Sequence, residues 1–323
     1  MALRHIQFAQ GTARLRLESG VVMDCTAPFE ARLENHARLR LVEGRLNVDV
    51  GERGFGFTVV MVAGEVVDLG TAFGVEATRD GGASVAVLSG KVEVKQSHQA
   101  ALSVVEGEGV RFRRQQAPQR LQSVRLEERG GIARLDWSAP AGAALVGDVM
   151  DNLTLPGLNR YYAIISGGMR SGATAFADRV PPRWLPDPGE AFPAELKGGD
   201  LVQTFHEQRQ TPDFRLRLQL LRPAVIYVLH DSRHATPEWL ARDFVKTQMR
   251  LRSGPWPKSA PITVGLEPLS NGQIYVSYEV WRREQPAPGA LALGSPFTHR
   301  RSGLPSMYGL VVKPLEPSSV FKQ

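Results

Sequence analysis

The sequence has little of several features, and each shortage narrows the classes of protein to which the chain can belong. Cys25 is the single cysteine among 323 residues, so an internal disulfide is excluded and a buried thiol is its expected role. No run approaches the roughly 18 apolar residues of a membrane-spanning helix. The first ten residues lack the apolar core of a signal peptide. We therefore expect a globular, soluble chain with no disulfide framework and no export signal.

Negative charge is in the minority, because 39 Lys and Arg stand against 33 Asp and Glu, for a net charge of +6. The arginines are spread along strand-like segments at every second position, as at 38–40 and 215–217. Nucleic-acid binders instead concentrate such charge on one face or stripe. Alternation places charge on the solvated face of a sheet and indicates general solubility. No nucleic acid is expected as a partner, and an acidic cell-surface polymer is the alternative reading of the charge.

Helical periodicity is scarce as well, whereas turn-forming residues are common, with 32 glycines and 22 prolines. Between residues 11 and 113, short runs alternate apolar and polar positions and are separated by Gly, Asn or Pro. This spacing is typical of a β-sandwich, jelly roll or barrel. The predicted fold is all-β, with two β-sandwich or jelly-roll-like domains at 11–113 and 148–323. Residues 114–147 are polar and turn-prone and are predicted to connect them.

One short helix is predicted near residues 237–245. Thr236 would be its N-cap, Pro237 would occupy the first helical position, and Glu238 favours the positive end of the helix. Trp239 and Phe244 have a spacing that is typical of aromatic residues packing a helix onto a sheet.

The most specific part of the sequence is a predicted strand, tight bend and second strand. Its defining residues are Asp68, Gly70, Thr71, Phe73 and Gly74. The two glycines are expected to bracket the bend, so that the phenylalanine between them drops into the core. The aspartate is placed to accept hydrogen bonds from the amides of the bend. Farther along, Ser89–Gly90 is predicted to form a hairpin with the strand that follows.

This region resembles the FecR domain, in the form found in multidomain proteins of planctomycete and verrucomicrobial type. That family shows an Asp-Leu-Gly-Thr-x-Phe-Gly-Val element followed by Val-x-Val-x-x-Gly-x-Val-x-Val. Both occur here in order, at 68–75 and 85–94. Residues 106–112 fit the closing strand, so the resemblance spans about residues 11–113.

The resemblance implies signalling without catalysis. The family's prototype passes an outer-membrane signal to a sigma-factor system from the periplasmic side, and its domain has no catalytic residues. Relatives carry a cytoplasmic segment and a membrane helix before the domain, whereas this sequence starts almost at the first strand. A truncated chain, a misplaced start and a free domain all stay open. We expect a periplasmic or cell-envelope location, membrane association only through a segment missing from this chain, and another envelope or signalling protein as partner.

The C-terminal unit resembles, more loosely, the galactose-binding-like β-sandwiches. The matching residues are 195–200, 225–233, 237–240, Phe244 and 307–308. The predicted ligand-binding residues are Tyr227, Asp231, Arg233, His234 and Trp239, which combine planar hydrogen-bonding groups with aromatic rings, as sugar sites do. The alternative is structural: Asp231 and Arg233 pair with each other or cap the helix that follows, and Trp239 and Phe244 pack that helix onto the sheet.

Three oxygen-bearing side chains lie within five positions at Asp148, Asp151 and Asn152. Jelly rolls of this general kind hold structural calcium through such loops, and an ordinary turn is the alternative. No other cofactor is expected. The sequence contains no Gly-x-Ser-x-Gly elbow and no phosphate loop before a helix.

The functional prediction is therefore a non-enzymatic signalling or scaffold protein of the cell envelope that regulates a sigma-factor and anti-sigma system. The alternative is a carbohydrate-binding or adhesive module that binds a polysaccharide through residues 148–323. A third hypothesis, an enzyme, requires paired carboxylates in a cleft at the spacing that glycosidases use.

Overall fold

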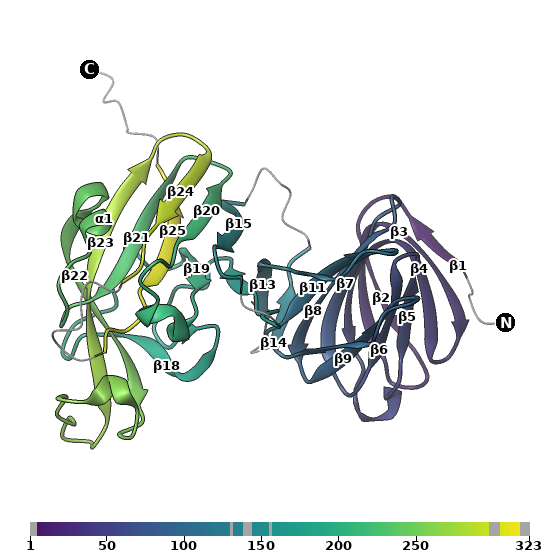
Figure 1. Cartoon of the computed structure of the whole chain (residues 1–323), viewed down its shortest axis with the longest axis horizontal. Coiled ribbons are helices and arrows are strands. Elements are labelled where there is room, and N and C mark those ends of the chain that lie inside the picture. Colours follow the sequence, from purple (N-terminus) through teal and green to yellow (C-terminus); the bar gives the residue numbers. More distant parts are fainter. Residues whose placement is uncertain (1–4, 130–131, 138–143, 155–156, 297–303, 317–323) are drawn as a thin grey trace. The chain divides into compact units, whose positions relative to one another are not determined.

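The computed structural model describes residues 5–129, 132–137, 144–154, 157–296 and 304–316 (Figure 1). Strands and turns dominate these residues, and α1 (Glu238–Asp243) is the one α-helix among them. The chain divides into two compact units, which we call unit 1 (residues 1–138 and 155–161) and unit 2 (residues 139–154 and 162–323). The predicted all-β, two-domain fold is confirmed.

Unit 1 is built on a 12-stranded sheet. Its strands are β1 (His5–Phe8), β2 (Thr12–Arg16), β3 (Val22–Asn35), β4 (Arg38–Asp49), β5 (Thr58–Met61), β6 (Gly64–Asp68), β7 (Ala72–Ala77), β8 (Gly82–Ser89), β9 (Lys91–Lys95), β10 (Leu102–Val105), β11 (Gly109–Arg113) and β12 (Gln119–Arg120). A 3-10 turn, η1 (Glu52–Gly54), precedes β5.

Strand β4 divides this sheet into two halves. One edge of β4 pairs with β3, while its other edge pairs with β5 at residues 38–40 and with β7 at residues 44–49. The first half has the strand order β10-β9-β6-β5, and the second has β7-β8-β11-β12. Apolar side chains of both halves share one core, as Val66 of β6 and Val85 of β8 illustrate. Unit 1 is therefore a sheet folded over a single core.

Where arginine and leucine alternate along a strand, the leucines are buried and the arginines are exposed, as predicted. In β4, Leu39 and Leu41 are buried, whereas Arg40 between them is exposed. In β20 (Leu216–Leu220) of unit 2, Leu216 is buried and Arg217 is exposed. The leucines supply the free energy of apolar burial, and the arginines keep the outer face in water.

The predicted role of Gly74 in the bend is wrong. Gly74 lies inside β7, and a Cβ atom at this position would overlap the side chain of Leu135. The Asn47 side chain holds Leu135 in place, because its Oδ1 accepts from Leu135 N at 2.9 Å and its Nδ2 donates to Leu135 O at 2.8 Å. The glycine is needed for close packing and not for a turn.

The predicted hairpin at Ser89–Gly90 is also wrong. Strand β8 pairs with β7 and β11, whereas β9 pairs with β6 and β10, so the chain crosses from one half of the sheet to the other at Gly90. Gly90 has φ +78°, and a Cβ there would overlap the carbonyl oxygen of Gly70. The turns at Gly70 and Gly90 therefore pack against each other. The alternation of apolar and polar residues shows which face of a strand is buried but not which strands pair, so it could not reveal this contact.

Residues 114–147 contain more regular structure than a polar connector suggests. They include β12, β13 (Ser123–Arg129), β14 (Ile132–Leu135) and the start of β15 (Val146–Asp151), and β13 pairs with β14 as an antiparallel hairpin. Residues 130–131 and 138–143 of this segment lie outside the described residues.

The chain returns to unit 1 after β15. The Tyr161 hydroxyl donates to Val87 O at 2.8 Å, and the Tyr161 amide donates to Gly107 O at 3.0 Å.

Unit 2 contains two strand arrays, with the orders β16-β19-β25-β21-β23-β22-β18-β17 and β15-β20-β24. Its remaining strands are β16 (Tyr162–Ile165), β17 (Thr174–Phe176), β18 (Arg179–Pro186), β19 (Asp200–Gln203), β21 (Ala224–Asp231), β22 (Val245–Trp256), β23 (Ile274–Gln285), β24 (Gly289–Leu293) and β25 (Gly309–Pro314). Two 3-10 turns, η2 (His206–Gln210) and η3 (Pro261–Thr263), complete it.

The short helix is where the sequence predicts it, but its first residues differ. Pro237, with ψ 143°, is the N-cap residue of α1, and no side chain caps the helix, so the predicted cap at Thr236 is wrong. The extended proline separates Thr236 from the first helical residue, Glu238, which places the threonine one position too early. Among the described helices, none has the length and apolar character needed to cross a membrane.

Replacing Gly74 with alanine is expected to lower the free energy of unfolding of unit 1 by about 1–3 kcal/mol, because the added methyl group overpacks against Leu135. Urea unfolding measures the change, with Ser103→Ala on the exposed side of β10 as the matched control. If the overlap is the cause, Leu135→Ala combined with Gly74→Ala costs less than the sum of the single changes. Additive losses would contradict this explanation.

Candidate functional site

The bend after β6 is organised by the carboxylate of Asp68. Asp68 is fully buried, and its Oδ2 accepts a hydrogen bond from Gly70 N at 2.9 Å. Gly70 has φ +95°, the left-handed conformation that glycine adopts without strain. Burial raises the pKa of Asp68, and the amides of Gly70, Thr71 and Gly56 oppose that rise.

The other side chains of the motif that follows Asp68 are buried as well. Phe73 is fully buried in the core of unit 1, and Thr71 is 5% exposed. The side chains of Asp68, Thr71 and Phe73 are therefore not accessible to an external ligand. It acts as an organiser of the fold.

The predicted ligand residues of unit 2 are largely engaged with each other. Asp231 is buried and accepts from Arg233 at both oxygens, with Nε to Oδ1 at 2.9 Å and Nη2 to Oδ2 at 2.7 Å. Ser306 N donates to Asp231 Oδ2 at 2.8 Å, and Arg233 Nη1 donates to Ile262 O at 2.9 Å. A bidentate pair of this kind, satisfied from three segments, stabilises the unit.

Of the other predicted residues, His234 lies close to this pair. Tyr227 is a buried residue of β21, and His234 is half-buried with its Nε2 3.9 Å from Asp231 Oδ2. Asp231 and Arg233 are thus paired with each other, as the structural alternative predicted. Sugar binding by the five predicted residues stays a prediction.

Trp239 lies in a different setting from the rest of that set. Its Nε1 donates to Ser295 O at 2.9 Å, and its ring meets those of Tyr308 and Phe244 edge-on at 5.7 and 6.0 Å. Trp239 also lines a pocket of about 600 Å³ that none of the other four predicted residues lines.

The charged residues of this pocket are Asp213, Arg215, Glu238 and Arg242. Sequence reasoning missed Asp213 and Arg215, because they lie in a different segment from the helix and only the fold brings them to Trp239. An aromatic ring among charged groups has the composition of a polar-ligand pocket.

The oxygens predicted to hold calcium accept hydrogen bonds within unit 2. Asp148 Oδ1 accepts from Val149 N at 2.9 Å, and Asp151 accepts from Leu153 N at 3.0 Å and from the Tyr162 hydroxyl at 2.7 Å. The Asn152 side chain bonds Asp213 O and Arg215 N at 2.8 and 2.9 Å. No group of three or more His, Cys, Asp or Glu side chains suited to a metal occurs among the residues that the structure describes. These contacts fit the ordinary-turn alternative, and calcium binding stays a prediction.

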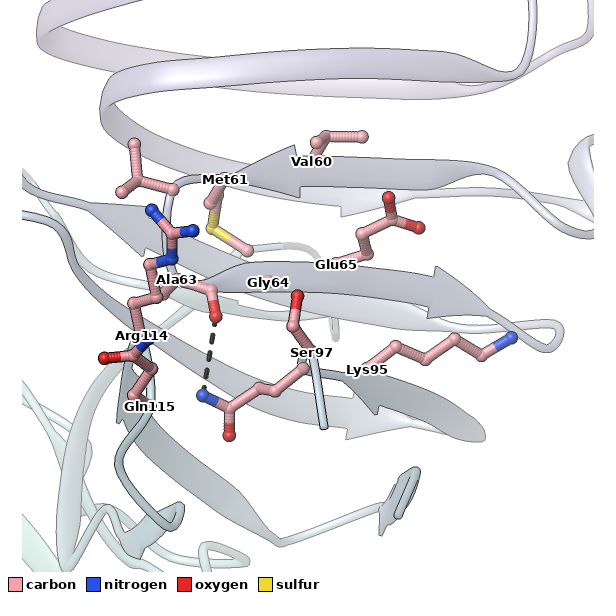
Figure 2. Close-up of a pocket in the computed structure, with 11 residues that line it drawn as sticks. Val60, Met61, Ala63, Gly64, Glu65, Lys95, Ser97, Arg114 and Gln115 are labelled. Carbon is pink, nitrogen blue, oxygen red and sulfur yellow. Dashed lines mark hydrogen bonds between the residues drawn. The ribbon is translucent and has the colours of Figure 1, made fainter. Parts of the chain in front are cut away.

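Unit 1 has a polar pocket of about 410 Å³ at the turn between β5 and β6. Figure 2 shows Arg114 and Gln115 on one side of the Ala63–Gly64 turn, with Lys95 and Ser97 on the other. Gln96 closes its floor, since its Nε2 donates to Arg113 O at 2.8 Å and to Ala63 O at 3.4 Å. The lining groups can form hydrogen bonds and ion pairs with a polar partner.

A larger pocket of unit 1, of about 760 Å³, lies along β2 and β14. Asp24 in its wall is paired with Arg14 at 2.6 Å and with Arg134. The ring of Trp137, 5.9 Å from the Arg45 guanidinium, forms another part of the wall. Asp24 is therefore already paired, while Glu127 and Asp136 add two further carboxylates to the lining, and these polar groups suit the pocket to polar contacts.

The comparisons with known proteins bear on unit 1. Residues 2–93 match the model of the FecR protein family. This region is therefore similar to FecR domains. The match confirms the resemblance for strands β1–β8 and most of β9; it covers less than a third of the 323 residues, and the predicted closing strand lies beyond it. No curated protein matches the chain.

Solved structures add only distant likenesses. Two structures of a "putative anti-sigma factor" from Parabacteroides distasonis are 22% identical, cover 36% and 35% of this chain, and have TM-scores of 0.32 and 0.31. The matched part spans 57% and 56% of the length of those chains. A β-glucuronidase from glycoside hydrolase family 2 is 14% identical over 95% of this chain and 30% of its own, with a TM-score of 0.35. TM-scores of this size do not establish a shared fold.

Replacing Asp68 with alanine is expected to destabilise unit 1 by about 1–3 kcal/mol, since the Gly70 amide loses its acceptor. Asp68→Asn keeps an acceptor oxygen and is expected to cost less. Because the folded pKa of Asp68 is raised, the wild type gains stability relative to Asp68→Asn as the pH falls through that pKa. Urea unfolding at pH 7 and pH 4 measures both effects; equal losses for the two variants would contradict the assigned hydrogen bond.

Proposed function

We propose that this chain is a non-enzymatic signalling protein of the cell envelope whose FecR domain regulates a sigma-factor and anti-sigma pair. The observation that carries the proposal is the match of residues 2–93 to the FecR family. The buried Asp68 bend supports it, because the most specific motif of the domain builds the fold and leaves the function to its surface.

The surface of unit 1 supports binding as its mode of action. The pocket in Figure 2 carries Glu65, Lys95 and Arg114, which are groups of both signs. Mixed charge around a polar hollow favours specific recognition of a protein segment by hydrogen bonds and ion pairs. In this proposal the FecR domain contacts an envelope or signalling protein and relays its state.

Transcript sequencing of the bacterium that encodes this chain tests the proposal. Overproduction of the wild type is expected to change the transcripts of one sigma-factor regulon several-fold. Asp68→Ala, which weakens the FecR domain, is expected to lose the effect, while Arg217→Gln on the exposed side of β20 keeps it. Unchanged transcripts with the wild type, at confirmed protein levels, would refute the regulatory role.

A second candidate function, carbohydrate binding by unit 2, is favoured by the pocket beside Trp239. Its combination of one indole ring with Arg215 and Asp213 suits a hydroxylated or acidic sugar. The retention of the full chain on gels containing neutral or acidic polysaccharides measures this activity. Arg215→Gln and Trp239→Ala are expected to reduce retention at least tenfold relative to Arg217→Gln. Lack of retention of the wild type on every polysaccharide would exclude this function for those ligands.

A further inference from the structure

Unit 2 contains a cluster of nitrogen donors for which no acceptor is found among the described residues. The cluster consists of Arg179 at the start of β18 and of His206 and Arg209 in η2. The ring of Trp256 lies beside two of these residues, 4.9 Å from the His206 ring and 5.8 Å from the Arg179 guanidinium carbon. The cluster is separate from the pocket that Trp239 lines.

The hydrogen bonds of His206 determine where its proton resides. Arg209 Nη1 donates to His206 O at 3.1 Å and also lies 3.3 Å from His206 Nδ1. Because a guanidinium group only donates, we assign Nδ1 as the acceptor of this second contact. The ring proton is therefore on Nε2. His206 is 1% exposed, and its Nε2 is buried with no hydrogen-bond partner in the described part of the chain. A buried donor left in this state bears the full cost of losing its contact with water.

The two arginines likewise have buried donors without acceptors. The Nε atoms of Arg179 and Arg209 are buried without a hydrogen-bond partner, and neither guanidinium forms an ion pair with a described carboxylate. The adjacent acid, Asp178, uses its oxygens to accept from His206 N at 2.8 Å and from Glu207 N at 3.0 Å. Trp256 supplies no acceptor, since its Nε1 donates to Ser253 Oγ at 3.0 Å.

The electrostatics of this cluster show the same excess of positive charge. Burial and the charges of Arg209, Arg179 and Arg233 lower the pKa of His206 to about 2. The pKa of Arg209 is lowered as well, by burial and then by Arg179, while the charges of Asp178 and Glu207 oppose that shift. Arg233 differs from the other two arginines because Asp231 neutralises it with two hydrogen bonds.

We propose that Arg179, His206 and Arg209 form a binding site for an oxyanion, such as the carboxylate, sulfate or phosphate group of a ligand. An oxyanion only accepts hydrogen bonds and can use several donors at once, as this cluster requires. The fork of a guanidinium group matches the geometry of carboxylate and phosphate oxygens. A neutral carbonyl would satisfy donors but would carry no charge opposite to that of the two arginines. The proposal does not depend on the signalling role of the FecR domain.

Titration calorimetry of the full chain with sodium sulfate, sodium phosphate and sodium acetate, at constant ionic strength set by sodium chloride, tests the proposal. Saturable binding with one site per chain is expected for at least one of these anions. Arg179→Gln and Arg209→Gln are expected to weaken it at least tenfold, and Arg217→Gln, an exposed arginine in the same unit, to leave it unchanged. Binding that all three variants retain equally would place the anion elsewhere and overturn the assignment.

A second measurement needs no variant and so does not depend on whether the substituted chains fold. Nuclear magnetic resonance of the arginine Nε–H groups in the wild type is expected to show two of these resonances shifting along the same saturation curve. Absence of saturable binding in both experiments would mean that water alone satisfies these donors, and the proposal would fail.

Discussion

The hydrogen bond from the Gly70 amide to the buried Asp68 carboxylate holds the bend on which the architecture of unit 1 depends. At this bend the chain crosses from the β5–β6 half of the sheet to the β7–β8 half, and at Gly90 it crosses back. The two crossings touch, because the Gly70 carbonyl occupies the space beside the Gly90 Cα. Leu69 N also donates to Lys91 O at 3.1 Å, which links the bend to the start of β9.

This arrangement explains physically why the FecR resemblance has two separate elements. Residues 68–75 contain the first crossing, and residues 85–94 contain the second. Each of these two sequence elements by itself specifies only a strand, a glycine and another strand. Together, their two crossings place both halves of the sheet over a shared core. A side chain at Gly90, or the loss of the acceptor at Asp68, would disturb both halves at once.

Unit 2 shows how buried polar groups with similar composition can have opposite roles. Asp231 and Arg233 satisfy each other, so they stabilise the interior and have little capacity left for a ligand. Arg179, His206 and Arg209 have donors to spare around one aromatic ring. The difference is that Asp231 hydrogen-bonds directly to the guanidinium of Arg233, whereas Asp178 beside the other cluster accepts from backbone amides. A directly paired carboxylate distinguishes a structural ion pair from a site that favours an external anion.

The sequence by itself determined the all-β class, the solvated faces of the strands, the position of the helix, and the Asp68–Gly70 bend, because alternation and turn chemistry are local properties. Strand partners are not local, so Ser89–Gly90 was predicted as a hairpin although it is a crossing, and Gly74 as a bend although it makes room for Leu135. The proximity of Arg215 to Trp239, and of Arg179 to His206, likewise arises from packing between distant segments. Only the tertiary structure decided these pairs, since a side chain's environment depends on what the fold places beside it.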